Sequence, residues 1–211
     1  MKAIIHGRLG IVVAVLLAAG AARAHGEPVC NDPVAAATLF EVAETIECNP
    51  GGSADPAADP FCLQEISRGL GARLADARLE GTIDGPPGFV GEAVVRASSV
   101  LSRVDWTGPA HGTIQVGGSR LRFSGQLDLS RARQDVPLAP IAGRWHGTRG
   151  LRAGGAFTGT FFVPFACPPE SGLSGACYLR LDEQGNVAGV VPAEVRDGVP
   201  LVRLDVTFCG R

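Results

Sequence analysis

The sequence feature that most restricts the fold is an alternation of apolar and polar residues on both sides of a two-glycine turn. Thr113 to Val116 precede Gly117-Gly118, and Ser119 to Leu129 follow it. A Gly-Gly pair accepts the positive φ angles of the tight turns that join antiparallel strands. The pattern therefore predicts a β-hairpin, with the cross-strand pairs Val116 and Ser119, Ile114 and Leu121, and Gly112 and Phe123.

This register sorts the side chains of the hairpin onto two faces. One face collects the apolar residues Ile114, Leu121, Phe123, Leu127 and Leu129. The other face collects Arg120, Arg122, Gln126 and Asp128. We expect the apolar face to belong to the core, where Gly112 leaves room for the ring of Phe123, and the arginines to face solvent.

Related hairpins follow one another along the chain. A skeleton of Gly-Thr followed by Phe-x-Gly occurs at residues 112–125 and 147–159 and, more loosely, at 81–91. Further apolar runs at residues 178–181, 187–191 and 201–208 are bounded by turn residues. Sequential hairpins predict a mainly β fold, an antiparallel meander of about 8–10 strands. The pattern does not choose between an up-and-down barrel and a two-sheet sandwich.

The segment before the meander shows a helical pattern instead. Asp32 and Pro33 form a helix start signal, and apolar residues then repeat at helical spacing through residues 33–47. Asp59-Pro60 repeats the signal before a second run that continues towards Leu79. We therefore predict two short helices within residues 25–80, packed on a β-domain of residues 81–211.

Residues 1–24 are typical of a secretory signal peptide. Lys2 and Arg8 precede an apolar run from Ile11 to Ala19, and Ala22-Arg23-Ala24 is a small-residue cleavage motif. The run is shorter than the roughly 20 residues that a membrane helix needs, and no later segment approaches that length. We expect cleavage after Ala24 and a secreted or periplasmic protein without a transmembrane segment. Lys2 is the only lysine of an Ala-, Gly- and Arg-rich chain, a composition typical of a GC-rich bacterial genome.

Six cysteines follow the predicted signal peptide: Cys30, Cys48, Cys62, Cys167, Cys177 and Cys209. An even number in an exported chain is typical of disulfides, and the lack of a Cys-x-x-Cys spacing disfavours a zinc site or a redox motif. One pair flanks a short loop between predicted strands, and another flanks the link between the predicted helices. The predicted bridges are Cys167–Cys177, Cys48–Cys62 and Cys30–Cys209, although Cys30 and Cys62 could exchange roles.

Charge is unevenly distributed along the chain. Without the signal peptide, 16 Arg (19 basic residues less Lys2, Arg8 and Arg23) stand against 21 acids, a net charge of −5. Residues 120–152 nevertheless carry seven Arg against Asp128 and Asp135, a balance of +5. Such a stretch suits an anionic polymer, and it is also what the solvated face of alternating strands looks like. The aromatic residues are few and occupy predicted core positions, so we expect no nucleic-acid binding.

Three histidines, His25, His111 and His146, follow the predicted cleavage site. His25 would become the N-terminus, where the free amine and the imidazole can chelate a transition metal such as copper. The His25-Gly26 start, with Trp106 to His111 further along, resembles the copper-dependent lytic polysaccharide monooxygenases. The resemblance implies a copper clamp made by His25 and a second histidine in a polysaccharide-oxidising enzyme. Residues 201–211 lack the aromatic region typical of that family.

No motif in the sequence specifies a reaction. The chain has no Gly-x-Ser-x-Gly elbow, no phosphate-binding loop and no His-Glu-x-x-His. We therefore predict a non-enzymatic, exported and disulfide-stabilised β-domain, a binding or structural envelope module whose partner is a small apolar ligand or an anionic polymer. The alternative is the copper protein that uses His25. The sequence specifies neither the ligand nor the oligomeric state.

Overall fold

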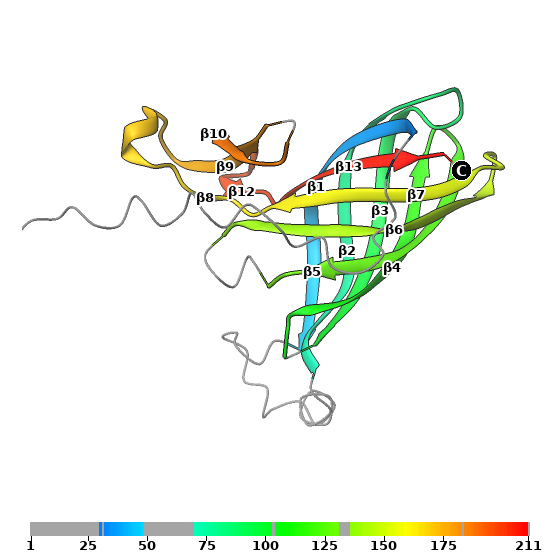
Figure 1. The fold of residues 1–211 in the computed structure, drawn as a ribbon, viewed down its shortest axis with the longest axis horizontal. Helices are drawn as coiled ribbons and strands as arrows, with labels where there is room; N and C mark the ends of the chain where they lie inside the picture. Colours follow the sequence, from blue (N-terminus) through cyan, green and yellow to red (C-terminus); the bar gives the residue numbers. More distant parts are fainter. Residues whose placement is uncertain are drawn as a thin grey trace, which may run out of the picture.

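The computed structural model describes residues 30, 32–48, 70–102, 104–130, 136–182 and 184–210. Antiparallel strands close into a barrel in the order β1-β13-β7-β6-β5-β4-β3-β2 (Figure 1). These strands are β1 (Pro33–Cys48), β2 (Leu70–Asp84), β3 (Gly91–Ser102), β4 (Thr107–Val116), β5 (Ser119–Asp128), β6 (Leu138–Arg149), β7 (Gly154–Phe162) and β13 (Arg203–Cys209). Of the two mainly β architectures predicted, the up-and-down barrel is therefore the observed one.

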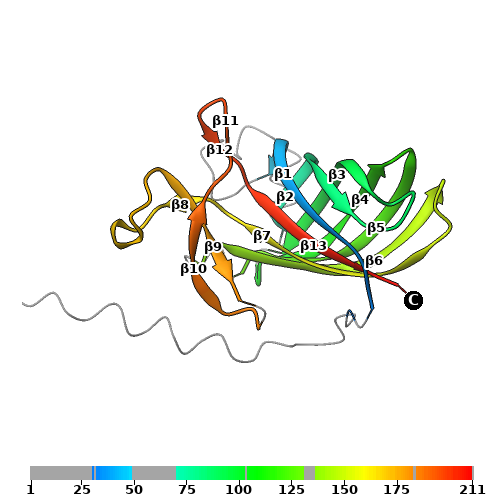
Figure 2. The same ribbon diagram turned by 90° about the horizontal axis from the view of Figure 1, so that it is seen from above.

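An insertion between β7 and β13 projects from one side of the barrel (Figure 2). It contains a three-stranded sheet in the order β10-β9-β8 and a two-stranded sheet of β11 and β12. Its elements are β8 (Phe165–Ala166), the 3-10 turn η4 (Pro169–Ser171), β9 (Ala176–Leu181), β10 (Val187–Pro192), β11 (Val195–Arg196) and β12 (Val199–Pro200).

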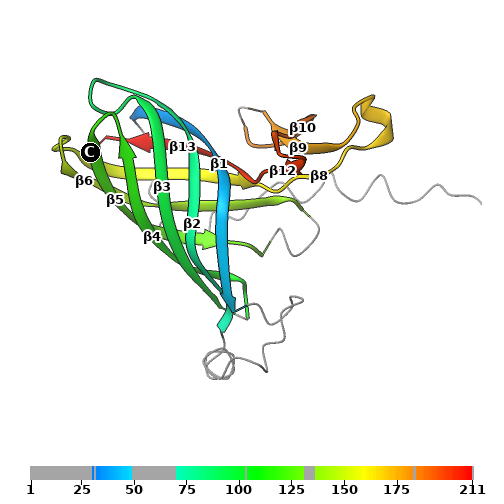
Figure 3. The ribbon, with the colours of Figure 1, turned by 180° about the vertical axis from the view of Figure 1, so that it is seen from behind.

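The first predicted helix is wrong, because residues 33–48 form the strand β1. Ala35, Ala37 and Leu39 alternate along β1 and are buried on the inner face of the barrel. β1 pairs with β2 on one side and β13 on the other, as Figure 3 shows from behind. Satisfying backbone hydrogen bonds on both edges outweighs the intrinsic preference of the alanines for a helix.

The second predicted helix lies partly outside the described residues. From Leu70 the chain forms β2, so the helix expected to reach Leu79 is wrong over its last part. The boundary predicted between residues 80 and 81 therefore falls within a barrel strand.

The predicted hairpin of residues 113–129 is confirmed. Val116 pairs with Ser119, Ile114 with Leu121, and Gly112 with Phe123. A Cβ atom at Gly112 would lie 2.7 Å from Cε1 of Phe123, so the ring occupies the space that the glycine leaves. The alternation along β5 buries Leu121, Phe123 and Leu127 and exposes Arg120 and Arg122.

Five aromatic side chains fill one end of the barrel and form what we call the aromatic plug: Phe89, Phe123, Trp145, Phe157 and Phe208. The ring of Phe89 lies 5.1 Å from Trp145 and 5.0 Å from Phe208, and Phe123 meets Phe157 edge to face at 5.8 Å. The indole Nε1 of Trp145 donates to the carbonyl oxygen of Cys209 at 3.2 Å. The plug is therefore packed and its buried indole is satisfied.

The described residues contain two disulfides, one between the two ends of the barrel chain and one within the insertion. Cys30 is bonded to Cys209, which ties the segment before β1 to the last strand, and Cys167 is bonded to Cys177 within the insertion. Both pairs are among those expected from the sequence. The predicted Cys48–Cys62 bridge involves Cys62, which lies outside the described residues.

Tyr178 anchors the insertion to the barrel. Its hydroxyl donates to the carbonyl of Leu201 at 2.6 Å and accepts from the Glu194 N–H at 3.2 Å. The guanidinium of Arg203, which pairs with Asp205, lies 5.7 Å from the ring centroid of Tyr178. Burial raises the pKa of the Tyr178 phenol, and the hydrogen bond from the backbone of Glu194 opposes that rise.

We expect Phe123→Ala to lower the free energy of unfolding by about 3–5 kcal/mol, because it removes a ring packed in the core. Arg122→Ala, one residue earlier on the exposed face, should change it by no more than about 0.5 kcal/mol. Urea titrations of both variants measure the difference. Equal losses of stability would contradict the observed assignment of faces on β5.

Tyr178 should also make stability depend on alkaline pH. The folded-state pKa is raised above the usual value of 10.0, so the stabilisation is present below that pH and is lost as the pH rises through the folded pKa. Tyr178→Phe should remove this pH dependence and cost about 1–2 kcal/mol near neutral pH, because the Leu201 carbonyl and the Glu194 N–H lose their partner.

The measurement is simple because Tyr178 is the only tyrosine. Phenolate absorbance reports its titration directly, and urea titrations at each pH report stability. A phenol that titrates at or below its usual pKa in the folded protein would show that the hydroxyl is not buried.

Candidate ligand-binding cavity

The barrel encloses a cavity of about 320 Å³ next to the aromatic plug. All the barrel strands contribute to its wall, which is made mostly of aliphatic and aromatic side chains. Leu39, Val95, Ile114, Leu127, Ile141 and Leu204 represent the aliphatic part of the wall. The inner face of the sheet therefore supplies an apolar site and not merely a packed core.

Small side chains in the wall, those of Ala97, Ser99, Ala110 and Ala139 among them, leave part of the barrel interior unfilled. In the register, Ser99 on β3 pairs with Ala110, Ala110 with Gly125, and Gly125 with Gly143. The next partner, Phe157, places its ring within 3.0 Å of where a Cβ of Gly125 would stand. The ring of Phe157 covers Gly125 and Gly143, whereas Ser99 and Ala110 line the cavity.

The aromatic plug separates this cavity from a more open hollow of about 590 Å³. The hollow lies at the end of the barrel that the plug fills. Phe89 and Trp145 line the hollow, whereas Phe123, Phe157 and Phe208 line the cavity. The plug thus forms the floor of the cavity.

The other end of the cavity, its mouth, is lined by residues at the far ends of the strands and just beyond them: Glu41, Leu74, Trp106, Leu129, Val163 and Val202. The strands spread apart towards this end (Figure 1). Backbone bonds from Glu41 to Val202 (2.8 Å) and from Leu129 to Trp106 (2.9 Å) join these segments. The adjoining turn is held by Asp105, whose pKa is lowered chiefly by the hydrogen bond from the Thr107 backbone.

Polar groups in the wall are few. Among the described lining residues only Glu41, Ser98 and Ser99 carry a hydroxyl or a charge. Ser99 is 4% exposed, and its Oγ has no hydrogen-bond partner among the residues that the structure describes. A buried hydroxyl without a partner is uncommon in folded proteins and points to a missing ligand or water.

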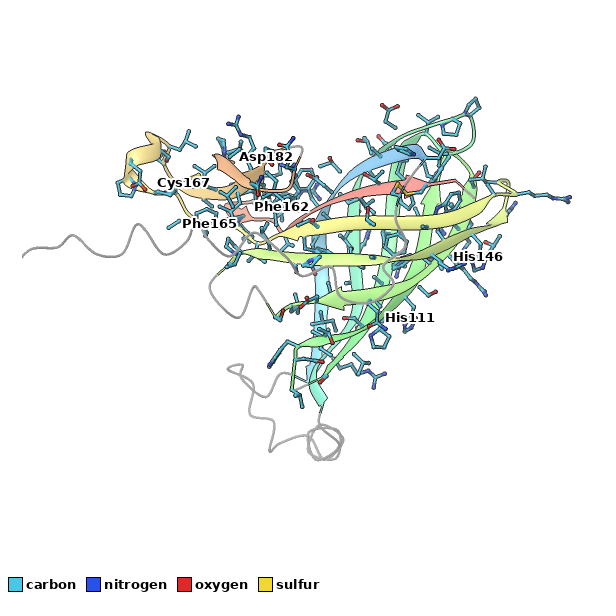
Figure 4. All side chains as sticks on the ribbon, in the orientation of Figure 1. His111, His146, Phe162, Phe165, Cys167 and Asp182 are labelled. Carbon is cyan, nitrogen blue, oxygen red and sulfur yellow. A yellow bond between two sulfur atoms is a disulfide. The ribbon has the colours of Figure 1, made fainter. Side chains whose placement is uncertain are left out.

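His111 and His146 lie away from the cavity, on the outer face of the barrel (Figure 4). His111 pairs in register with Ser124 and His146 with Arg122, so β5 runs between the two histidines. The described residues contain no cluster of three or more His, Cys, Asp or Glu side chains suited to a metal ion. His25 lies outside the described residues, so the copper site at the N-terminus stays a prediction.

The predicted basic stretch forms part of a larger surface, which we call the basic face: Arg96, Arg120, Arg122, Arg144 and Arg149. These exposed arginines stand on the outer faces of β3, β5 and β6, and none of them forms an ion pair with another described residue. The acids of these strands, Glu92 and Asp128, stand near strand ends. Arg131 and Arg133 lie outside the described residues.

The sequence singled out the arginines of residues 120–152, four of which belong to the basic face, but the cavity and Ser99 were missed. The sequence did contain a signal for Ser99, because Val95, Ala97, Ser99 and Leu101 continue the alternation that begins at Ala93. Extending the strand by three pairs of residues would have placed a serine among the inward-facing residues.

The fold and the cavity define a class: an antiparallel eight-stranded barrel with an apolar interior site and a disulfide-bonded insertion. Comparisons of the chain with protein-family models, curated proteins and solved structures find no match. Within the described residues, no helix has the length and apolar character needed to cross a membrane.

Proposed function

We propose that the protein is an exported module that binds a small apolar ligand inside its barrel. The observation that carries the proposal is the apolar cavity of about 320 Å³, which lies within the range of roughly 300–1,000 Å³ of small-molecule sites. Eight strands form a barrel whose interior is wide enough to hold one small ligand. The Cys30–Cys209 and Cys167–Cys177 bridges support export, since disulfides persist in oxidising compartments.

Energetics also favour an occupied cavity. Without a guest, the apolar wall of the cavity faces water through the mouth, which costs roughly 25 cal/mol for each Å² left exposed. A barrel selected for stability alone would fill the space with larger side chains at lining positions such as Ala97 or Ala110. Small residues at these positions instead keep the interior free for a guest.

A neutral fluorescent probe such as N-phenyl-naphthylamine should bind and brighten inside the barrel. Ala110→Leu should weaken the binding of the probe. The three added carbon atoms of leucine take the place of about three methylene groups that the guest would otherwise bury in the cavity. At about 0.8 kcal/mol for each methylene, the loss is about 2.4 kcal/mol, or roughly sixtyfold in Kd. Fluorescence titration measures this change.

Ala142→Leu is the matched control, because Ala142 stands on the outer face of β6 between Gln126 and Thr158. It should leave the Kd of the probe unchanged. If both variants bind the probe as the wild type does, the probe is not in the cavity, and the proposed function loses its support.

The basic face favours a second binding function, association with an anionic polymer. Five arginines on β3, β5 and β6, none ion-paired with another described residue, create a positive surface on a protein whose predicted mature net charge is −5. Long-range attraction of this kind concentrates polyanions near the surface and weakens as salt screens it.

The double variant Arg122→Ser/Arg144→Ser should weaken retention on a sulfated polysaccharide resin, by about tenfold in affinity if each surface contact contributes up to about 1 kcal/mol. Elution in a salt gradient measures it. The control, Arg180→Ser/Arg196→Ser, makes the same charge change on the insertion. Elution of wild type without retention at low salt would leave the basic face as ordinary solvated surface.

A further inference from the structure

We infer that the cavity selects an uncharged ligand that carries one hydroxyl or carbonyl group, and that Ser99 forms the hydrogen bond to that group. The inference rests on the proposed function, because it names the class of guest that the barrel binds. It is carried by three features of the cavity wall: the free hydroxyl of Ser99, the small residues around it, and the signs of the charges nearby.

Ser99 lies where the barrel interior needs no polar group. It faces inward on β3 between Ala97 and Leu101, and only 4% of it is exposed. Its Oγ is the buried side-chain oxygen that the described residues leave without a partner. An alanine would fit the same position without a hydroxyl to satisfy, so the hydroxyl serves something other than packing.

The neighbours of Ser99 in the sheet offer no side-chain partner. Ala110 pairs with it directly, and Gly125 and Gly143 follow at the same level of the barrel. Their backbone groups are engaged in the hydrogen-bond ladders between the strands. The hydroxyl of Ser99 is thus available to a guest, and the small side chain of Ala110 beside it leaves that guest room to approach.

The charges of the wall argue for an uncharged guest. No arginine or histidine is among the described lining residues, so the carboxylate of a fatty acid would find no cation within the cavity. The one charged lining residue, Glu41, stands at the mouth and is acidic, so it offers no cation to an anionic guest. A serine hydroxyl can donate to a carbonyl oxygen or accept from a hydroxyl, and it can do both without any buried charge.

A matched set of naphthalenes tests the inference, carrying a methyl, hydroxymethyl, carboxylate or aminomethyl group at the same position. Each compound competes with N-phenyl-naphthylamine for wild type, Ser99→Ala and the control Ser124→Ala, whose serine is exposed on β5. For each compound, the ratio of the Kd of the variant to that of wild type cancels its intrinsic solubility. The comparison therefore isolates the contribution of one hydroxyl.

Ser99→Ala should weaken the hydroxymethyl compound by roughly two- to tenfold, the value of one neutral hydrogen bond, and change the methyl compound less than about twofold. Ser124→Ala should change neither. Wild type should bind the carboxylate and aminomethyl compounds more weakly than the hydroxymethyl compound. Ser99→Ala should not lower the melting temperature, because it removes a hydroxyl that has no partner in the fold.

The outcomes separate the two proposals. Suppose that the probe binds and that Ser99→Ala weakens the binding of the methyl and hydroxymethyl compounds equally, or weakens the binding of neither. The role of Ser99 is then refuted, while the proposal of an apolar site stands. Tightest binding of a charged compound would also refute the inference. A lower melting temperature for Ser99→Ala would make Ser99 a structural residue. If no compound displaces the probe, or the probe does not bind, the proposed function itself fails.

Discussion

The closure of the sheet by β1 is the constraint on which the rest of the structure depends. β1 pairs with β2 from Ala36 onward and with β13 from Pro33 to Phe40, so one segment removes both free edges that the meander would otherwise expose. The Cys30–Cys209 bond stands beside this seam and ties its two chains together. Because the sheet closes, its inward faces enclose a volume instead of packing on a second layer. The interior site is a direct consequence of that topology.

The sizes of the inward-facing side chains at successive positions along the strands determine how much of the enclosed volume is filled. At one end, Phe89, Trp145 and Phe208 meet at centroid distances of 5.0–6.0 Å, and the cavity and the outer hollow share no described lining residue. Beside these rings, Ala97, Ser99 and Ala110 are small residues that line the cavity, whereas the ring of Phe157 covers Gly125 and Gly143. The rings thus form the floor of the cavity, and the small side chains beside them leave it space.

The local patterns predicted the strands well where period two and turn chemistry agreed. The hairpin around Gly117-Gly118 has the predicted register, and the mainly β, antiparallel class is observed. Residues 33–48 misled because Ala35, Ala37 and Leu39 fit the strand period while neighbouring apolar residues also fit a helix, and only pairing with distant β13 decides between them. The cavity could not be predicted from the sequence for a related reason. It depends on Ala97, Ser99, Ala110 and Ala139 coming together in the wall, which needs the registers of several strands at once.

The inner and outer faces of the barrel follow different rules, and this difference makes the two proposed binding functions compatible with one small fold. Outside, the arginines of β5 and β6 face solvent, which satisfies them, and the packing of the barrel does not depend on them. Inside, the side chains pack against one another, so a polar group that does not contribute to packing is conspicuous. A hydroxyl at position 99 conflicts locally with an otherwise consistent apolar interior, and such conflicts are expected at functional sites. The strongest pointer to a ligand is therefore a single oxygen atom that the fold leaves unsatisfied at the level where it also leaves space.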